Sequence, residues 1–263
     1  MRLHIDVFME YRLGGDDRVL LTLEAAQTEG QTVLGTALDI ENASVRRIAG
    51  NGRIGQRAWA FVADEQFRLR YRAGVQVTRS DAALQALPAT PLDGLPAEVV
   101  TYLRPSRFCQ SDLFTNLAAR RFGHLEGGAK VAAIRDWVAD ELTYAPGSSH
   151  AATTAMDTFV AREGVCRDYA HLVCSLARAA HIPARYTSVY GPDVQPQDFH
   201  AVAEVWLDGA WHLVDATGMG SASRFAVIGS GRDAADVAFM ETENWAQLVS
   251  LSIRVSEDQP APQ

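Results

Sequence analysis

Apolar and polar residues alternate over the first 80 residues of the chain, a pattern that predicts β-strands. The segment 66–77 shows it most clearly, because Phe67, Leu69 and Tyr71 alternate with arginines. Glycine-rich turns separate this segment from similar ones, which cover residues 2–10, 19–25, 32–41 and 57–62. Since no helical period interrupts them, we expect residues 1–80 to form a small antiparallel β-sandwich.

The alternation dissolves in the segment 81–98, which is interrupted repeatedly by proline. Proline breaks regular structure, so we expect a linker and a domain boundary here. Residues 99–255 then form the second predicted domain. The last residues, 256–263, read SEDQPAPQ and are expected to form a disordered tail.

Helical periodicity dominates the first half of the second domain. Apolar residues recur at spacings of three and four in the segments 111–122 and 128–144. In the second segment they form one stripe, expected to be core, that comprises Val131, Ile134, Trp137, Val138 and Leu142. Strand-like segments return at 184–191, 200–207, 210–217, 225–229 and 248–255. Helices followed by antiparallel strands predict an α+β fold for this domain.

The composition is that of a globular protein, with 48% hydrophobic and 21% charged residues. The net charge of −8 and the pI near 5.4 argue against nucleic-acid and membrane partners. No segment approaches the ~18 continuous apolar residues of a membrane span, and the start lacks the apolar stretch of a signal peptide. Three cysteines are too few for a disulfide framework. We therefore expect a soluble, cytoplasmic protein with reduced thiols.

One cysteine, Cys166, opens a helical pattern that covers about residues 165–180 and stops before a proline. The unpaired N–H groups and the dipole of a first helical turn favour a thiolate and lower a thiol pKa from about 8.5. The same N–H groups can hold an oxyanion. Most free cysteines are buried apolar residues instead, and we interpret Cys174 in this way. The role of Cys109 stays open.

A thiolate nucleophile needs an imidazole base and a third group that orients the imidazole. The sequence Asp-Gly at 208–209 predicts a two-residue hairpin turn. This turn makes His200 and Asp215 diagonal neighbours on one face, about 7–8 Å apart along the backbone, whereas His212 projects from the opposite face. Taken singly, His200 and Asp215 are also compatible with ordinary polar residues at strand ends. A loop with an odd number of residues would reverse the assignment.

The order of Cys166 in GVCRDYAH, followed by His200 and Asp215 in DFHAVAEVWLDGAWHLVDAT, resembles the transglutaminase-like superfamily of papain-type thiol enzymes. The likeness is strongest to its bacterial branch, which is described as transglutaminase-like proteins and cysteine proteases. Further matching stretches are YLRPSRFCQSD, AIRDWVADELTYAPGSS, TTAMDTFVAREGVCRD and GRDAADVAF. The resemblance implies Cys166 as nucleophile, His200 as base and Asp215 as orienting group. It also implies a helix that bears the cysteine, packed on an antiparallel sheet.

These residues predict a thiol enzyme that attacks an amide carbonyl and forms a thioester, on a protein, peptide or small amide substrate. We favour hydrolysis by a cysteine protease or amidase; the alternatives are an amine-accepting transglutaminase and a non-catalytic binding module. The side-chain donor of an oxyanion hole stays open among Gln110, Trp137 and Tyr144.

No cofactor or metal is expected. Cys166, His171 and Cys174 do not converge on one face of their helix, and no spacing typical of a zinc site occurs. The calcium-binding regions of animal transglutaminases have no counterpart in the sequence. Oligomeric state is not predicted.

Overall fold

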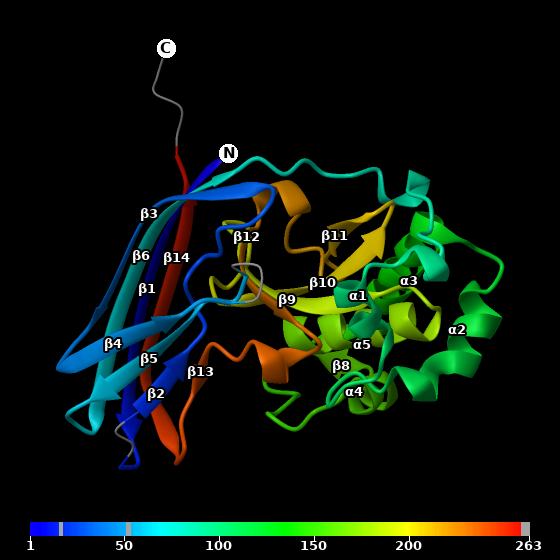
Figure 1. Cartoon of the computed structure of the whole chain (residues 1–263). Coiled ribbons are helices and arrows are strands. Elements are labelled where there is room, and N and C mark those ends of the chain that lie inside the picture. Colours follow the sequence, from blue (N-terminus) through cyan, green and yellow to red (C-terminus); the bar gives the residue numbers. More distant parts are fainter. Residues whose placement is uncertain (16–17, 51–53, 259–263) are drawn as a thin grey trace.

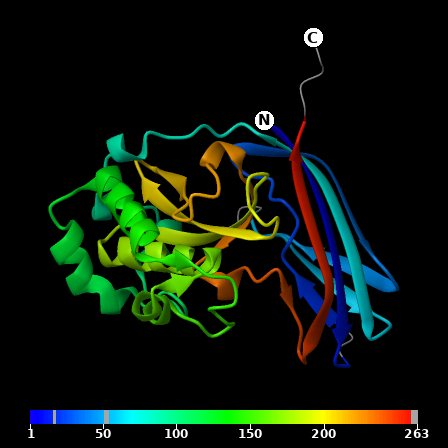
Figure 2. The same ribbon diagram turned by 180° about the vertical axis from the view of Figure 1, so that it is seen from behind.

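The computed structural model describes residues 1–15, 18–50 and 54–258. Strands of the N-terminal part lie on one side of the molecule, and the helices lie on the other (Figures 1 and 2). Within the described residues, no helix is both long enough and apolar enough to cross a membrane.

The N-terminal side is a sandwich of antiparallel sheets ordered β14-β1-β6-β3 and β13-β2-β5-β4. Their strands are β1 (Arg2–Leu13), β2 (Arg18–Leu21), β3 (Gln31–Ile40), β4 (Ala43–Ile48), β5 (Arg57–Val62), β6 (Gln66–Val77), β13 (Met240–Glu241) and β14 (Ala246–Glu257).

The predicted alternation of β6 is confirmed. Phe67, Leu69 and Tyr71 are buried in the core between the sheets. The intervening arginines face outward and pair with acidic residues of neighbouring strands, as Arg70 does with Asp6 at 2.5 Å. Strand β4 was not predicted, because it packs few apolar side chains and most of its residues are exposed.

The second part of the chain packs helices on the antiparallel sheet β11-β10-β9-β12. The strands of this sheet are β9 (Ala184–Tyr190), β10 (His200–Leu207), β11 (Ala210–Val214) and β12 (Ala226–Gly231). Two short strands, β7 (Thr143–Tyr144) and β8 (Glu163–Gly164), form a separate parallel pair. The helices of this part are α1 (Ala97–Val100), α2 (Thr115–Phe122), α3 (Gly127–Glu141), α4 (Ala155–Ala161) and α5 (Cys166–Ala179). Short 3-10 turns are η2 (Leu84–Ala86), η3 (Leu92–Gly94), η4 (Thr101–Leu103), η5 (Ser111–Phe114), η6 (Ala222–Arg224) and η7 (Ala234–Asp236). The α+β fold class is confirmed.

The apolar stripe predicted for α3 is buried along its whole length, as expected. The helix is shorter than the predicted segment 128–144, because it ends at Glu141. Thr143 instead donates its backbone N–H to the carbonyl of Arg162 at 2.9 Å, and strand β7 forms. Helix α4 was not predicted; it begins where the hydroxyl of Thr154 accepts the N–H of Asp157.

Strand β14 corrects two predicted boundaries. It pairs with β1 from Leu3↔Glu257 to Leu13↔Ala246, so it completes the N-terminal sheet rather than belonging to a domain at 99–255. The physical reason is that the edge of β1 needs a partner for its N–H and C=O groups, wherever in the chain that partner lies. The predicted tail 256–263 loses its first two residues to β14, and residues 259–263 lie outside the described residues.

The predicted linker 81–98 lies against the helical part. The N–H of Gly128 in α3 donates to the carbonyl of Leu87 at 2.8 Å. The side chains of Leu84 and Leu87 pack on the apolar cluster that contains α3 and α5. Gly128 leaves room for this approach, since a Cβ there would lie 1.6 Å from the carbonyl oxygen of Leu84.

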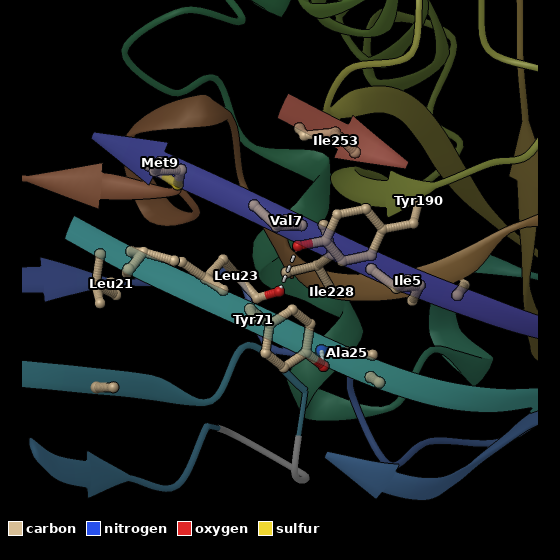
Figure 3. Packing of buried hydrophobic residues seen from close by; sticks show 14 of the residues in the cluster. Ile5, Val7, Met9, Leu21, Leu23, Ala25, Tyr71, Tyr190, Ile228 and Ile253 are labelled. Carbon is tan, nitrogen blue, oxygen red and sulfur yellow. Dashed lines mark hydrogen bonds between the residues drawn. The ribbon is translucent and has the colours of Figure 1, made fainter. Parts of the chain in front are cut away.

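Tyr190, at the end of β9, joins the two parts of the chain (Figure 3). It is fully buried in the sandwich core, and its hydroxyl donates to the carbonyl of Leu23 at 2.7 Å. Its ring stacks on Tyr71, with centroids 6.4 Å apart, and the hydroxyl of Tyr71 accepts the N–H of Ala25 at 2.8 Å. The sheet β11-β10-β9-β12 therefore extends into the core of the sandwich, and the two parts share one apolar cluster.

We expect Tyr190→Phe to lower the free energy of unfolding by about 1–3 kcal/mol, because the buried carbonyl of Leu23 loses its hydrogen bond. Urea denaturation measures this change. Tyr102→Phe is the matched control, since the hydroxyl of Tyr102 has no hydrogen-bond partner in the described part of the chain. Equal stabilities of the two variants would show that Tyr190 does not anchor the junction.

Candidate active site

Cys166 is the first residue of α5, as the sequence predicts. The buried carboxylate of Asp168 holds this end of the helix, because its Oδ2 accepts the N–H of Val165 at 2.9 Å. Arg167 pairs with the other carboxylate oxygen at 3.2 Å and balances its charge. Gly164 is required before the helix, since a Cβ there would lie 2.7 Å from the side chain of Asp168. The position of the thiol is therefore fixed by local contacts.

The three cysteines differ in access. Cys166 is partly exposed, whereas Cys109 and Cys174 are fully buried in the helical core. The interpretation of Cys174 as a core residue is confirmed by its burial, which raises the pKa of its thiol well above the usual value. Cys109, left open by the sequence, lies beside it and donates to the carbonyl of His171 at 3.6 Å. Only Cys166 is open to a substrate or reagent.

The hairpin has the register that the sequence predicts. Leu207 pairs with Ala210, and both turn residues, Asp208 and Gly209, have positive φ angles of 50° and 74°. Such angles are typical of the tight turn that joins two strands through two residues. His212 lies opposite Val205, on the other face from His200, and donates to the carbonyl of Leu207 at 3.1 Å.

His200 and Asp215 meet as the register requires. The Nε2 atom of His200 lies 3.2 Å from Oδ2 of Asp215, and both side chains are almost fully buried. The other carboxylate oxygen of Asp215 accepts the N–H of Thr217 at 2.8 Å and its hydroxyl at 2.7 Å. Thr217 therefore fixes the carboxylate, which in turn orients the imidazole.

The same imidazole interacts with the thiol of Cys166, so His200 lies between Cys166 and Asp215. Its Nδ1 atom is buried and forms no hydrogen bond with any described residue. Burial lowers the pKa of His200, but the hydrogen bond to Asp215, together with the neighbouring thiol of Cys166 and the charges of both residues, outweighs that effect. They raise the pKa from 6.5 to about 9, so the imidazole is protonated at neutral pH.

His171 lies on the same helix as Cys166 but faces elsewhere. It is fully buried, and its Nε2 atom accepts the N–H of Ala234 at 3.1 Å. Burial lowers its pKa to about 3, which keeps the ring neutral. Among residues 1–15, 18–50 and 54–258, no group of three or more His, Cys, Asp or Glu side chains is placed to hold a metal ion.

The three residues that the sequence offered as oxyanion donors have different surroundings in the structure. Tyr144 of β7 pairs with Gly164, and its hydroxyl interacts with Cys166. Burial and the charge of Cys166 raise the pKa of Tyr144 to about 12, so the hydroxyl keeps its proton. The sequence could not place Tyr144 near Cys166, because this approach depends on the pairing of β7 with β8.

The other two residues lie elsewhere. The side-chain oxygen of Gln110 accepts the N–H of Met156 at 3.4 Å, at the start of α4. Trp137 is buried in the helical core, where its ring contacts Phe122 and Phe159 at centroid distances of 6.2 Å.

The fold and the site define an α+β protein in which a helix bears a thiol at its first residue and packs on an antiparallel sheet. The family described as the transglutaminase-like superfamily matches residues 117–216, the range that contains Cys166, His200 and Asp215. A solved structure from Cytophaga hutchinsonii, named a "putative cysteine protease", is 31% identical and has a TM-score of 0.92. The match covers 100% of this chain and 93% of that one. This chain belongs to the transglutaminase-like superfamily.

Curated relatives are uncharacterized proteins of mycobacteria. One from Mycobacterium leprae is 33% identical over 119 residues, which cover 42% of this chain and 42% of the relative. One from Mycobacterium tuberculosis is 32% identical over 180 residues, which cover 60% of this chain and 56% of the relative. The chain thus spans about half the length of the curated relatives that it matches.

The raised pKa of His200 predicts a specific dependence on pH. Because the folded pKa is about 9 and the ordinary value is 6.5, the folded protein holds this proton more tightly than the unfolded chain does. The resulting stabilisation is fully present below about pH 6.5 and is lost as the pH rises through 9. NMR titration of the imidazole should give a midpoint near 9, and Asp215→Asn should lower it. A midpoint at or below 6.5 would contradict the proposed pairing.

Proposed function

We propose that this protein is a thiol enzyme that cleaves amide bonds through a thioester on Cys166. The observation that carries the proposal is the position of His200, between a partly exposed thiol at a helix start and the fixed carboxylate of Asp215. This arrangement supplies a nucleophile, a proton carrier and an orienting group, with the proton carrier next to both of the others. A non-catalytic binding module would have no use for a protonated imidazole buried beside a thiol.

In the first half of the reaction, the thiolate of Cys166 adds to the carbonyl carbon of the amide. The carbonyl oxygen becomes an oxyanion, for which we propose the backbone N–H of Cys166 and the hydroxyl of Tyr144 as hydrogen-bond donors. The imidazolium of His200 gives its proton to the amide nitrogen. The C–N bond then breaks, the amine leaves, and the acyl group stays on sulfur as a thioester.

In the second half, a water molecule attacks the thioester carbonyl while neutral His200 takes a proton from it. The C–S bond breaks, the acid is released, and the thiolate and imidazolium form again. Hydrolysis is favoured by the likeness along the whole chain to the structure named a "putative cysteine protease". If an amine replaced water, the same residues would act as a transglutaminase.

The assignment of the base is tested by three variants in an assay of amide cleavage. His200→Ala should lower the rate by about 10²–10⁴, the usual effect of losing a general base. Asp215→Asn should also be severe, because an amide can stabilise the wrong imidazole tautomer. His212→Ala should stay within a few-fold of wild type, since its side chain projects from the other face of the hairpin. Loss of activity in His212→Ala with a normal His200→Ala enzyme would refute the assignment.

The choice between water and amine is tested by giving the enzyme a glutamine-containing peptide with and without a labelled primary amine. We expect ammonia release to proceed at the same rate in both reactions, with little label in the product. Cys166→Ala is the control and should release no ammonia. Stoichiometric incorporation of the amine would show a transglutaminase instead.

A further inference from the structure

The ring of Phe225 packs against the imidazole of His200. Their centroids are 5.6 Å apart, their planes are inclined by 33°, and Phe225 is fully buried. The strand that follows Phe225 lies close to His200, because Val227 and His200 pair with Val189 of β9 from its two sides. The ring therefore occupies space beside the imidazole that water would otherwise fill.

Two glycines leave room for this ring. A Cβ at Gly191 would lie 2.8 Å from the ring of Phe225, and a Cβ at Gly220 would lie 2.6 Å from its Cζ atom. With the chain so close around it, the ring has little freedom to move once its own backbone is fixed. The contacts that fix this backbone therefore determine where the ring lies against His200.

Gln31, the first residue of β3 in the sandwich, holds the backbone next to Phe225. Its side-chain oxygen accepts the N–H of Val227 at 2.7 Å. Its amide nitrogen donates to the carbonyl of Val227 at 2.9 Å and to that of Ala26 at 2.6 Å. The N–H of Ala26 also donates to the carbonyl of Val227, at 2.8 Å. Gln31 is buried, so its loss would leave buried donors and acceptors unpaired.

Two residues that follow β6 hold the chain before Phe225. Nη1 of Arg79 donates to the carbonyl of Ala222 at 3.2 Å and to that of Phe225 itself at 3.1 Å. The carboxylate of Asp81 accepts the N–H of Ser223 at 2.9 Å and its hydroxyl at 2.7 Å. The sandwich, together with the chain that leaves it, thus bonds the backbone on both sides of Phe225.

The surroundings of Phe225 are apolar. It belongs to a buried cluster whose other members are Ala26 of the sandwich and Val189, Val194, Val202 and Val227. The titratable groups that act on His200 come from other elements: Cys166 from α5, and Asp215 from the chain after β11. By excluding water, the apolar side keeps the bond between His200 and Asp215 in a medium of low dielectric, where the bond is stronger.

We infer that the N-terminal sandwich positions the imidazole of His200 through Phe225, and that Gln31 is the residue that holds Phe225 in place. This inference rests on the proposed function, since it deepens the account of the same site. Gln31 and Phe225 are positioning residues. The hydrogen bonds of Gln31 go to Ala26 and Val227, and Phe225 meets the imidazole through its ring.

NMR titration of His200 tests both steps without a substrate. In Phe225→Ala, water fills the space beside the imidazole, so the effects of burial and of the charge on Asp215 both diminish. The midpoint should then fall from about 9 toward 6.5. Gln31→Leu keeps an apolar side chain but cannot bond Val227, so its midpoint should fall in the same direction. A midpoint that stays near 9 in either folded variant overturns the inference. Gln31→Leu decides alone if Phe225→Ala does not fold.

Gln76→Leu is the matched control. The side-chain amide of Gln76 also donates to a backbone carbonyl within the sandwich, that of Met1 at 3.0 Å, but its bonds lie away from Phe225. Its His200 midpoint should equal that of wild type. A midpoint as low as in Gln31→Leu would overturn the inference, because the loss of any amide hydrogen bond in the sandwich would then have the same effect.

The pH profile of amide cleavage separates this inference from the proposed function. Because His200 gives its proton to the leaving amine, kcat should fall at alkaline pH as the imidazole loses that proton. In Gln31→Leu this fall should begin at lower pH, and kcat at neutral pH should be about tenfold lower with little change in KM. Identical profiles in wild type and both variants overturn the inference alone. Lowered midpoints without any Cys166-dependent turnover overturn the proposed function alone.

Discussion

A protonated imidazole cannot be buried without groups that compensate its charge, and this constraint organises the site. His200 is 2% exposed, and its pKa lies near 9 because Cys166 and Asp215 approach it from either side. Each partner needs support of its own: Thr217 holds the carboxylate, and the first turn of α5 holds the thiol. The tight hairpin turn and the buried cap of α5 are therefore conditions for the charge state of one imidazole.

The N-terminal sandwich packs directly against the elements that carry the site. Tyr190 ends the strand next to β10 and inserts into the sandwich core, where it is fully buried. Ten residues further along, the chain returns as His200, after a segment that Gln197 ties to β14. Strand β9 contacts the sandwich, and the adjacent strand β10 carries the imidazole. Movement of the two parts against each other would therefore displace the site.

Asp198 and Asp215 are two carboxylates with contrasting surroundings. Asp215 is buried, accepts two hydrogen bonds from Thr217 and contacts His200, so its position in the site is fixed. Asp198 is accessible and forms no ion pair with any described residue. Both lie close to His200 in sequence or in space. Their partners, rather than their residue type, determine what each can do.

Local signals in the sequence determined the parts of this protein that depend on neighbouring residues. The Asp-Gly turn at 208–209 and strict alternation placed His200 with Asp215, and helical periodicity placed Cys166 at a helix start. Tertiary structure decided whatever depends on distant partners. Strand β1 pairs with β14 from the other end of the chain, and the pairing of β7 with β8 places Tyr144 near the thiol. Backbone hydrogen bonding is the same for every sequence, so composition and periodicity cannot reveal which distant strands will pair.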